Sequence, residues 1–300
     1  MLRRDLLRYG SLLSTIALTS TSKAFAIDAF QRSAPGRLRL SLAAYSMRKY
    51  LAPGGNESRR LDLFDFVDFC REHGLDGTEL TSYYFPPDVD DDYLFRLRRH
   101  CHLAGITISG GAIRNDYCSL DSEKVASDLE HTKLWIDRYA LLGAPVIRIF
   151  AGQGNDQEPL STTLSRCARN CEIACEYAAK KGLILALENH GGVTARADDL
   201  IEIVRQVDSP AFGINFDSGN FRGTEDPYQE LAKIAPYAVN AQIKVEIQVD
   251  GKKQEADLKR ILEILRSAGY SGWVALEYEA TEEPWEAIPR WLSELKKLLD

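Results

Sequence analysis

The chain has 300 residues, of which 45% are hydrophobic and 27% charged, a composition typical of a globular protein. Its formal net charge of -7, from 37 basic and 44 acidic residues, disfavours nucleic acid as a partner. Beyond residue 26 no run of about 18 apolar residues occurs, so we expect no transmembrane segment there.

The start of the chain resembles an export signal. Arg3 and Arg4 precede leucines and a short apolar stretch, and an Ala-x-Ala cleavage pattern ends at Ala26. This order predicts a twin-arginine-type signal over residues 1–26 and a linker over residues 27–37. The protein is then expected to be periplasmic or secreted. A disordered basic tail or a retained lipid-facing anchor is the alternative.

The remainder alternates between short apolar runs and stretches with helical periodicity, most of which end at a glycine. The expected strands lie at 38–44, 75–80, 106–109, 146–152, 183–188, 212–217, 238–245 and 273–279. The expected helices lie at 61–73, 93–104, 122–142, 164–181, 198–207, 228–234, 256–268 and 285–299. Strict alternation implies a parallel sheet, and about eight units imply closure. We therefore predict an α/β fold, a single-domain (β/α)8 TIM barrel over residues 38–300. An open doubly wound sheet is the alternative.

Four of the later strands end in polar side chains, which are Glu188, Asp217, Gln242 and Glu277. The carboxyl ends of barrel strands are where active sites form. Carboxylates that face one cavity repel each other unless a cation neutralises them, and oxygen ligands favour hard cations. These four residues therefore predict a divalent metal site, with Mn²⁺ or Mg²⁺ as the expected ion. Alternatively, the carboxylates cap the following helices or pair with Lys and Arg.

Four motifs carry a resemblance to a known family. They are LENHGG (187–192), NFDSGNF (215–221), QIKVE (242–246) and LEYE (276–279). From Leu38 onward the chain resembles the xylose-isomerase-like barrel superfamily of sugar isomerases and epimerases. The resemblance implies that the four strand-end residues hold the metal and that Glu188 and Glu277 are also the catalytic acid and base.

Two positions depart from the family pattern. Gln242 stands where relatives usually have a histidine, and Asn220 stands where many epimerases place a histidine three residues after the aspartate. A glutamine carbonyl binds a hard cation more weakly. The departures therefore indicate a subfamily distinct from the well-known ketose epimerases.

Four further residues are candidates for substrate binding, namely Glu79, His190, Asn220 and Lys244. The resemblance makes Glu79 a pocket residue, although a glutamate that caps a helix or forms a salt bridge fits the same position. His190 lies beside the metal-facing glutamate and either binds substrate hydroxyls or is structural. Lys244 either pairs with a nearby glutamate or polarises a substrate carbonyl.

These features together predict a metal-dependent isomerase or epimerase that acts on a sugar or keto-sugar by proton transfer next to a carbonyl, through an enediolate. The expected partner is a small-molecule carbohydrate, and an oligomer is compatible with the sequence. A lyase or dehydratase acting on a keto-glycoside, or a non-catalytic sugar-binding barrel, remains open. An endonuclease for abasic DNA shares the superfamily, but the few histidines and the acidic charge disfavour it.

Overall fold

The computed structural model describes residues 28–52 and 59–299, so the predicted export signal lies outside the described residues. Eight parallel strands close into a barrel in the order β1-β10-β7-β6-β5-β4-β3-β2. The strands are β1 (Leu38–Ala43), β2 (Gly77–Thr81), β3 (Thr107–Ala112), β4 (Val146–Ile149), β5 (Ile184–Glu188), β6 (Phe212–Asp217), β7 (Ala238–Ile243) and β10 (Gly272–Leu276). The closed strand order confirms the predicted (β/α)8 barrel and excludes the alternative, an open sheet.

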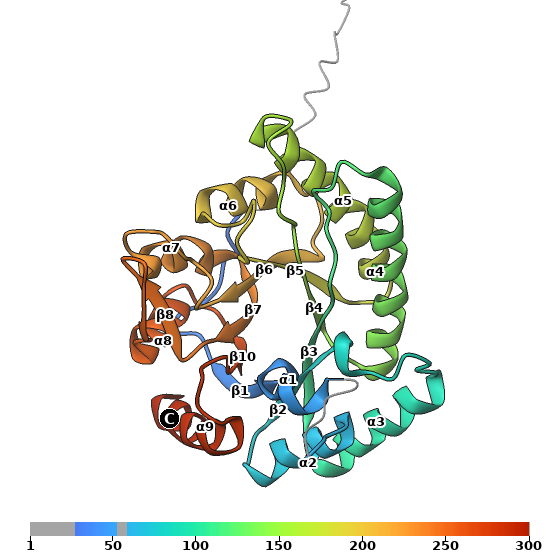
Figure 1. Ribbon diagram of the computed structural model, residues 1–300, viewed down its shortest axis with the longest axis vertical. Coiled ribbons are helices and arrows are strands. Elements are labelled where there is room, and N and C mark those ends of the chain that lie inside the picture. Colours follow the sequence, from blue (N-terminus) through green and yellow to red (C-terminus); the bar gives the residue numbers. More distant parts are fainter. Residues whose placement is uncertain (1–27, 53–58, 300) are drawn as a thin grey trace, which may run out of the picture.

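Helices surround the barrel, as Figure 1 shows. They are α1 (Arg48–Leu51), α2 (Leu63–Glu72), α3 (Asp91–Ala104), α4 (Ser122–Leu142), α5 (Leu160–Lys180), α6 (Ala197–Gln206), α7 (Pro227–Ile234), α8 (Leu258–Ser267) and α9 (Pro284–Leu299). Gly105 and Gly143 follow α3 and α4 with φ of +74° and +81°, the left-handed caps expected from the sequence. Within the described residues we find no helix that combines the length and the apolarity of a membrane span.

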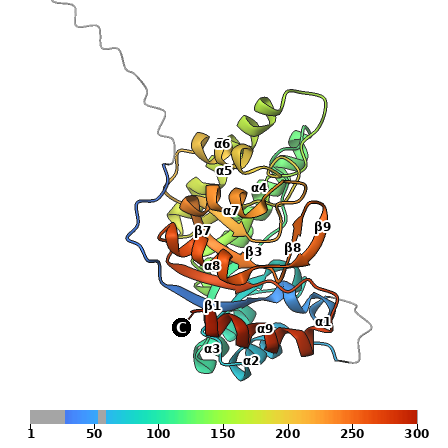
Figure 2. The ribbon, with the colours of Figure 1, turned by 90° about the vertical axis from the view of Figure 1, so that its left-hand side faces the viewer.

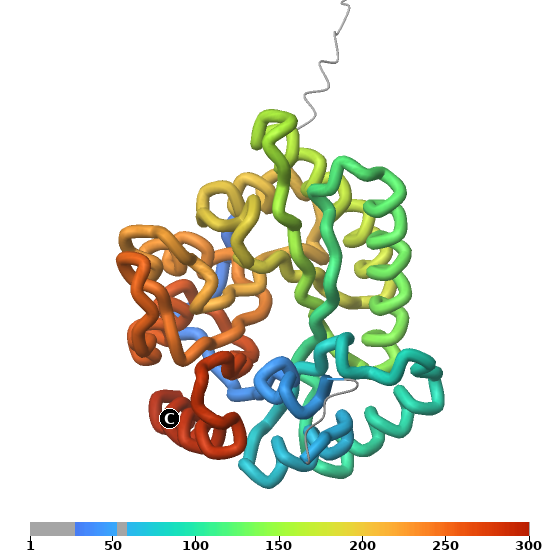
Figure 3. The backbone as a smooth tube through the Cα atoms, in the orientation of Figure 1, coloured from blue at the N-terminus to red at the C-terminus, as the bar shows by residue number. Residues whose placement is uncertain are grey.

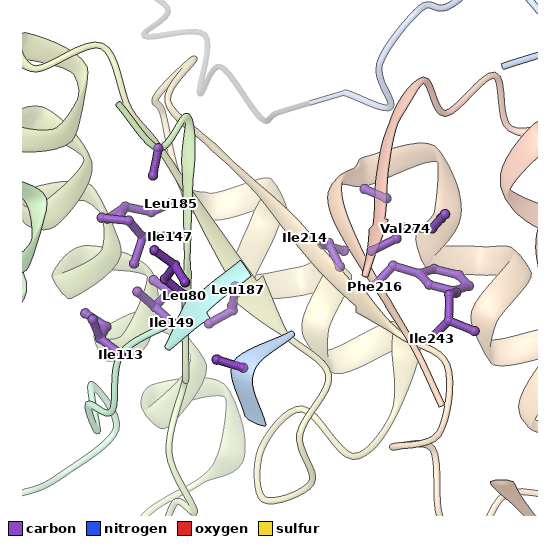
Figure 4. Close-up of a cluster of buried hydrophobic side chains, with 14 of the residues drawn as sticks. Leu80, Ile113, Ile147, Ile149, Leu185, Leu187, Ile214, Phe216, Ile243 and Val274 are labelled. Atoms are coloured by element: carbon purple, nitrogen blue, oxygen red, sulfur yellow. The ribbon is translucent and has the colours of Figure 1, made fainter. Parts of the chain in front are cut away.

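Side chains alternate along the barrel strands between a helix-facing layer and the barrel interior. Ile147 and Ile149 of β4 pair in register with Leu185 and Leu187 of β5, and all four are fully buried in the hydrophobic core. Figure 4 shows them grouped together. The intervening positions are largely polar and buried, among them Ser41, Glu79, Ser109, Arg148, Glu188, Asn215, Asp217, Asn240 and Gln242. The interior of this barrel is therefore a polar network, whereas branched apolar residues usually fill it.

A hairpin that the sequence analysis did not predict follows β7. It consists of β8 (Glu246–Val249) and β9 (Lys252–Glu255), which pair antiparallel. Asp250 and Gly251 form its turn with φ of +50° and +72°, as a two-residue hairpin turn requires. Figure 2 shows the hairpin on the same side of the barrel as α1, which follows the end of β1. The hairpin thus lies at the carboxyl end of the barrel.

The predicted linker packs against the opposite end. The backbone N–H of Phe30 donates a hydrogen bond to the carbonyl of Pro236 at 3.1 Å, and Arg32 donates to the carbonyl of Ala238 at 2.7 Å. Ala238 is the first residue of β7. In Figure 3 the first described segment (blue) runs close to the last helix (red), where β1 and β10 close the barrel. These contacts cover the amino end of β7. The carboxyl ends of the strands are therefore the end of the barrel that is available for a functional site.

Candidate active site

A cavity of about 440 Å³ opens at the carboxyl ends of the strands. Its wall includes Tyr45, Tyr83, Arg148, Phe150, Glu188, His190, Lys244, Glu277 and Glu279. The volume falls in the range of small-molecule sites, and the wall combines aromatic rings with charged groups. A ligand with both apolar faces and hydroxyl groups matches such a wall.

Glu188 ends β5 on one side of this cavity. Its Oε2 lies 2.8 Å from Nε of Arg148, and both side chains are at most 4% exposed. Its Oε1 accepts a hydrogen bond of 2.7 Å from Asn220. Burial raises the pKa of Glu188 to about 7, although the guanidinium of Arg148 acts in the opposite direction. Near neutral pH this carboxyl group can therefore either accept or release a proton.

Lys244 lies directly after β7 and also lines the cavity. Its Nζ lies 3.1 Å from Asp217, 3.3 Å from Glu277 and 2.7 Å from Glu279. We call these three residues the carboxylate cluster. Burial alone would lower the pKa of Lys244, but the cluster outweighs it and holds the pKa well above its ordinary value. Lys244 is therefore a permanent cation in this site.

The carboxylates around Lys244 differ in their acidity. Burial raises the pKa of Glu277 to about 7, and it raises the pKa of Asp217 to about 7 as well, even though Lys244 acts to lower both. For the more exposed Glu279, burial also acts to raise the pKa, but Lys244 outweighs it and the pKa lies below its ordinary value. Of the three, only Glu277 and Glu279 line the cavity. Glu277 is therefore the second group there that can exchange a proton near neutral pH.

Gln242 belongs to a buried layer of amides beside the cavity. Its Oε1 accepts a hydrogen bond of 2.6 Å from Asn215, and its Nε2 donates to Glu79 at 2.6 Å. Asn240 donates to the other oxygen of Glu79 at 2.9 Å. Burial raises the pKa of Glu79 to about 7. The residues that line the cavity do not include Glu79 or Gln242; in the structure Glu79 belongs to this amide layer, and its contact with substrate stays a prediction.

The structure brings the four predicted metal ligands together, but their arrangement does not fit a divalent ion. The ammonium of Lys244 already lies against Asp217 and Glu277, and Asn215 occupies the carbonyl oxygen of Gln242. Within residues 28–52 and 59–299, no three His, Cys, Asp or Glu side chains form a group that could hold a metal. The sequence analysis left open that these carboxylates pair with Lys and Arg, and such ion pairs are present in this site.

The remaining predicted residues take two different positions. His190 lines the cavity, and its ring lies 4.3 Å from that of Phe150. Burial, followed by Arg148 and Lys244, lowers the pKa of His190 to about 4, so the imidazole is neutral. Asn220 is not among the lining residues, because it is buried between Glu188 and Lys244, to which it is hydrogen-bonded.

Sequence reasoning missed several residues of the wall, of which Arg148 is the most important. Besides its ion pair with Glu188, Arg148 donates to the carbonyl of Ile113 at 2.7 Å and lies 4.0 Å from the ring centroid of Phe150. A signal was present, because an arginine interrupts the apolar strand Val146–Ile149 near its carboxyl end. An isolated charge at such a position indicates a buried partner.

Comparison with known proteins supports this architecture. Residues 67–295 match a family model described as xylose isomerase-like TIM barrel. An uncharacterised protein of Methanocaldococcus jannaschii is 27% identical over 129 residues, which cover 40% of this chain and 44% of that protein. The chain thus matches less than half the length of this curated relative.

Three solved structures illustrate the likeness. A xylose isomerase-like TIM barrel protein from Mycobacterium smegmatis in complex with magnesium has a TM-score of 0.68 and 19% identity, covering 89% of this chain and 97% of its own. The 3-keto-D-glucoside 4-epimerase from E. coli has a TM-score of 0.66 and 15% identity, covering 87% and 100%. The IolI protein with a bound zinc atom has a TM-score of 0.69 and 17% identity, covering 87% and 96%.

At these identities the solved structures establish the fold, whereas the family model extends over most of the barrel, from within α2 to within α9. The match begins after β1 and includes both strands with residues in the cavity wall, β4 and β5. This chain belongs to the xylose isomerase-like TIM barrel family.

Proposed function

We propose that the protein is a sugar isomerase or epimerase that transfers a proton next to the carbonyl of a free sugar, a keto-sugar or a keto-glycoside. The observation that carries this proposal is the pair Glu188 and Glu277. Both line one cavity, both have a pKa raised by burial to about 7, and each has a cationic side chain beside it. Two carboxyl groups with such pKa values suit general acid and base catalysis at neutral pH.

In the proposed reaction, one carboxylate removes the proton from the carbon next to the carbonyl. The electron pair of that C–H bond moves toward the carbonyl oxygen and forms an enediolate. A carboxylic acid then returns a proton. Protonation of the same carbon from its other face gives an epimer. Protonation of the former carbonyl carbon gives an isomer, and in that case the proton of the adjacent hydroxyl group moves to the former carbonyl oxygen. The cations of Lys244 and Arg148 lie beside the cavity, where they would stabilise the negative charge that develops on oxygen.

Family membership supports a carbohydrate substrate, and one structural neighbour is named as a keto-glucoside epimerase. Two neighbours were solved with magnesium or zinc, which supports divalent metal binding in the family. No step proposed for this chain involves such an ion, because the ammonium of Lys244 already lies against Asp217 and Glu277.

The proposal is tested by the exchange of solvent deuterium into keto-sugars and keto-glycosides, followed by NMR. The wild type is compared with Glu188→Gln and Glu277→Gln, which preserve side-chain shape but cannot accept the proton. We expect each variant to lose at least about 100-fold in exchange rate. The matched control is Glu263→Gln, because Glu263 is 58% exposed on α8 and does not line the cavity; it should exchange like the wild type.

Other outcomes would identify other functions. Sugar binding without exchange in the wild type would indicate a non-catalytic binding barrel. Release of an aglycone or of water after exchange would indicate a lyase or dehydratase in the same site. Near-normal exchange in either folded glutamine variant would exclude that glutamate from proton transfer.

A further inference from the structure

The loop after β6 is built around Lys244. The Oγ of Ser218 accepts a hydrogen bond of 2.7 Å from the backbone N–H of Lys244, and the Oδ1 of Asn220 accepts one of 3.1 Å from its Nζ. A Cβ atom on Gly219 would lie 2.7 Å from Cδ of Lys244, so the glycine leaves room for the lysine stem. Asp217 completes the contacts with its ion pair. All four residues of the Asp-Ser-Gly-Asn segment therefore position this one side chain.

The position of the Lys244 ammonium is central and buried. The side chain is 9% exposed, and its Nζ lies within 3.3 Å of all three members of the carboxylate cluster. A buried cation with several anionic partners is costly to remove, because its partners would be left facing each other without a counter-charge. The ammonium thus supplies a positive counter-charge to all three carboxylates.

The expected metal ligand Gln242 is also partly engaged. One lone pair of the Gln242 Oε1 accepts a hydrogen bond from Asn215 at 2.6 Å, so a hard cation would share this oxygen with Asn215. The amide nitrogen of Gln242, which cannot ligate such an ion, is the group that approaches Glu277, at 3.5 Å. A metal at this position would have to displace Lys244, which is the main obstacle.

We infer that Lys244 is the resident cation of this site and takes the place that a divalent metal would need among Asp217, Glu277 and Gln242. The lysine lines the cavity, so its positive charge would lie next to the substrate oxygens. This catalytic role rests on the proposed function. The inference that Lys244 occupies the metal position does not rest on the proposed function, and it is tested without substrate.

The test measures Mn²⁺ binding to chelator-treated protein by EPR of the free ion. We expect the wild type to bind no Mn²⁺ at this site. Lys244→Ala removes the ammonium and leaves the carboxylate cluster without a counter-charge. This variant should therefore bind one Mn²⁺ per chain, at least about 10-fold more tightly than any binding by the wild type. The double variant with Asp217→Asn should lose the added binding. The matched control is Lys259→Ala, because Lys259 is 73% exposed on α8; it should behave like the wild type.

Two results would overturn the inference. One is stoichiometric Mn²⁺ binding by the wild type that Asp217→Asn abolishes, a measurement that needs no lysine variant. The other is a Lys244 variant that is folded by circular dichroism but gains no Mn²⁺ binding. If Lys244→Ala does not fold, Lys244→Met retains the stem and provides the same comparison. Either of these two results leaves the isomerase proposal intact. That proposal is tested only by the deuterium exchange assay.

Discussion

Burial raises the pKa of Glu188 and of Glu277 to about 7, and this sets the pH range of the proposed reaction. The base must be ionised, so the rate rises as the pH increases through about 7. The acid must be protonated, so the rate falls as the pH increases further. We therefore predict a maximum of kcat/KM near pH 7 with a decline on both sides, measured by deuterium exchange between about pH 5 and 9. A constant rate over this range would contradict the pKa values assigned to the pair.

Gln242 is expected to contribute to stability through the hydrogen bonds that it joins. In Gln242→Leu, Glu79 loses a donor and Asn215 loses an acceptor, and both side chains are at most 1% exposed. Each buried group left unpaired costs about 1–3 kcal/mol, so we expect the free energy of unfolding to fall by roughly 2–5 kcal/mol in denaturant titrations. Gln229→Leu, on the exposed face of α7, should change it little. Equal stability of both variants would show that the amide layer is not required.

At the residue scale, the sequence predicted which groups meet but not how they pair. Glu188, Asp217 and Glu277 could be located because each ends an apolar strand, and strand ends converge in a barrel. The position of Lys244 depends on the space beside Gly219, and the orientation of Gln242 depends on Asn215. Both are three-dimensional facts without a periodic signal. This is why the sequence alone left a metal and a lysine as alternative counter-charges.

At the scale of elements, the eight barrel strands and the helices between them were predictable because apolar runs and terminal glycines mark them. Helix α4 begins and ends at the predicted residues, and its cap, Asp121, accepts hydrogen bonds from the N–H groups of Glu123 and Lys124. The hairpin of β8 and β9 was missed because β9 is fully exposed and polar, and its residues lack the alternation of a half-buried strand. The Asp-Gly pair at its turn was the available signal.

At the scale of the whole molecule, closure of the barrel places Glu188 of β5 and Glu277 after β10 in one cavity, although β6 and β7 lie between their strands. The export of the chain stays a prediction, because residues 1–26 lie outside the described residues. If the chain is exported, a non-phosphorylated sugar is the expected substrate, since phosphorylated metabolites are mainly cytoplasmic. An amino terminus at Ile27 in protein recovered from outside the cytoplasm would support the predicted cleavage.

Solvent deuterium exchange into a keto-sugar by the wild type, measured in chelator and again with added Mn²⁺, tests the whole account most directly. It requires both proton transfer by the two glutamates and charge stabilisation by Lys244, which neighbours Glu277 at 3.3 Å. The account predicts exchange in chelator at a rate that added Mn²⁺ does not increase. Exchange that occurs only after Mn²⁺ is added would contradict it.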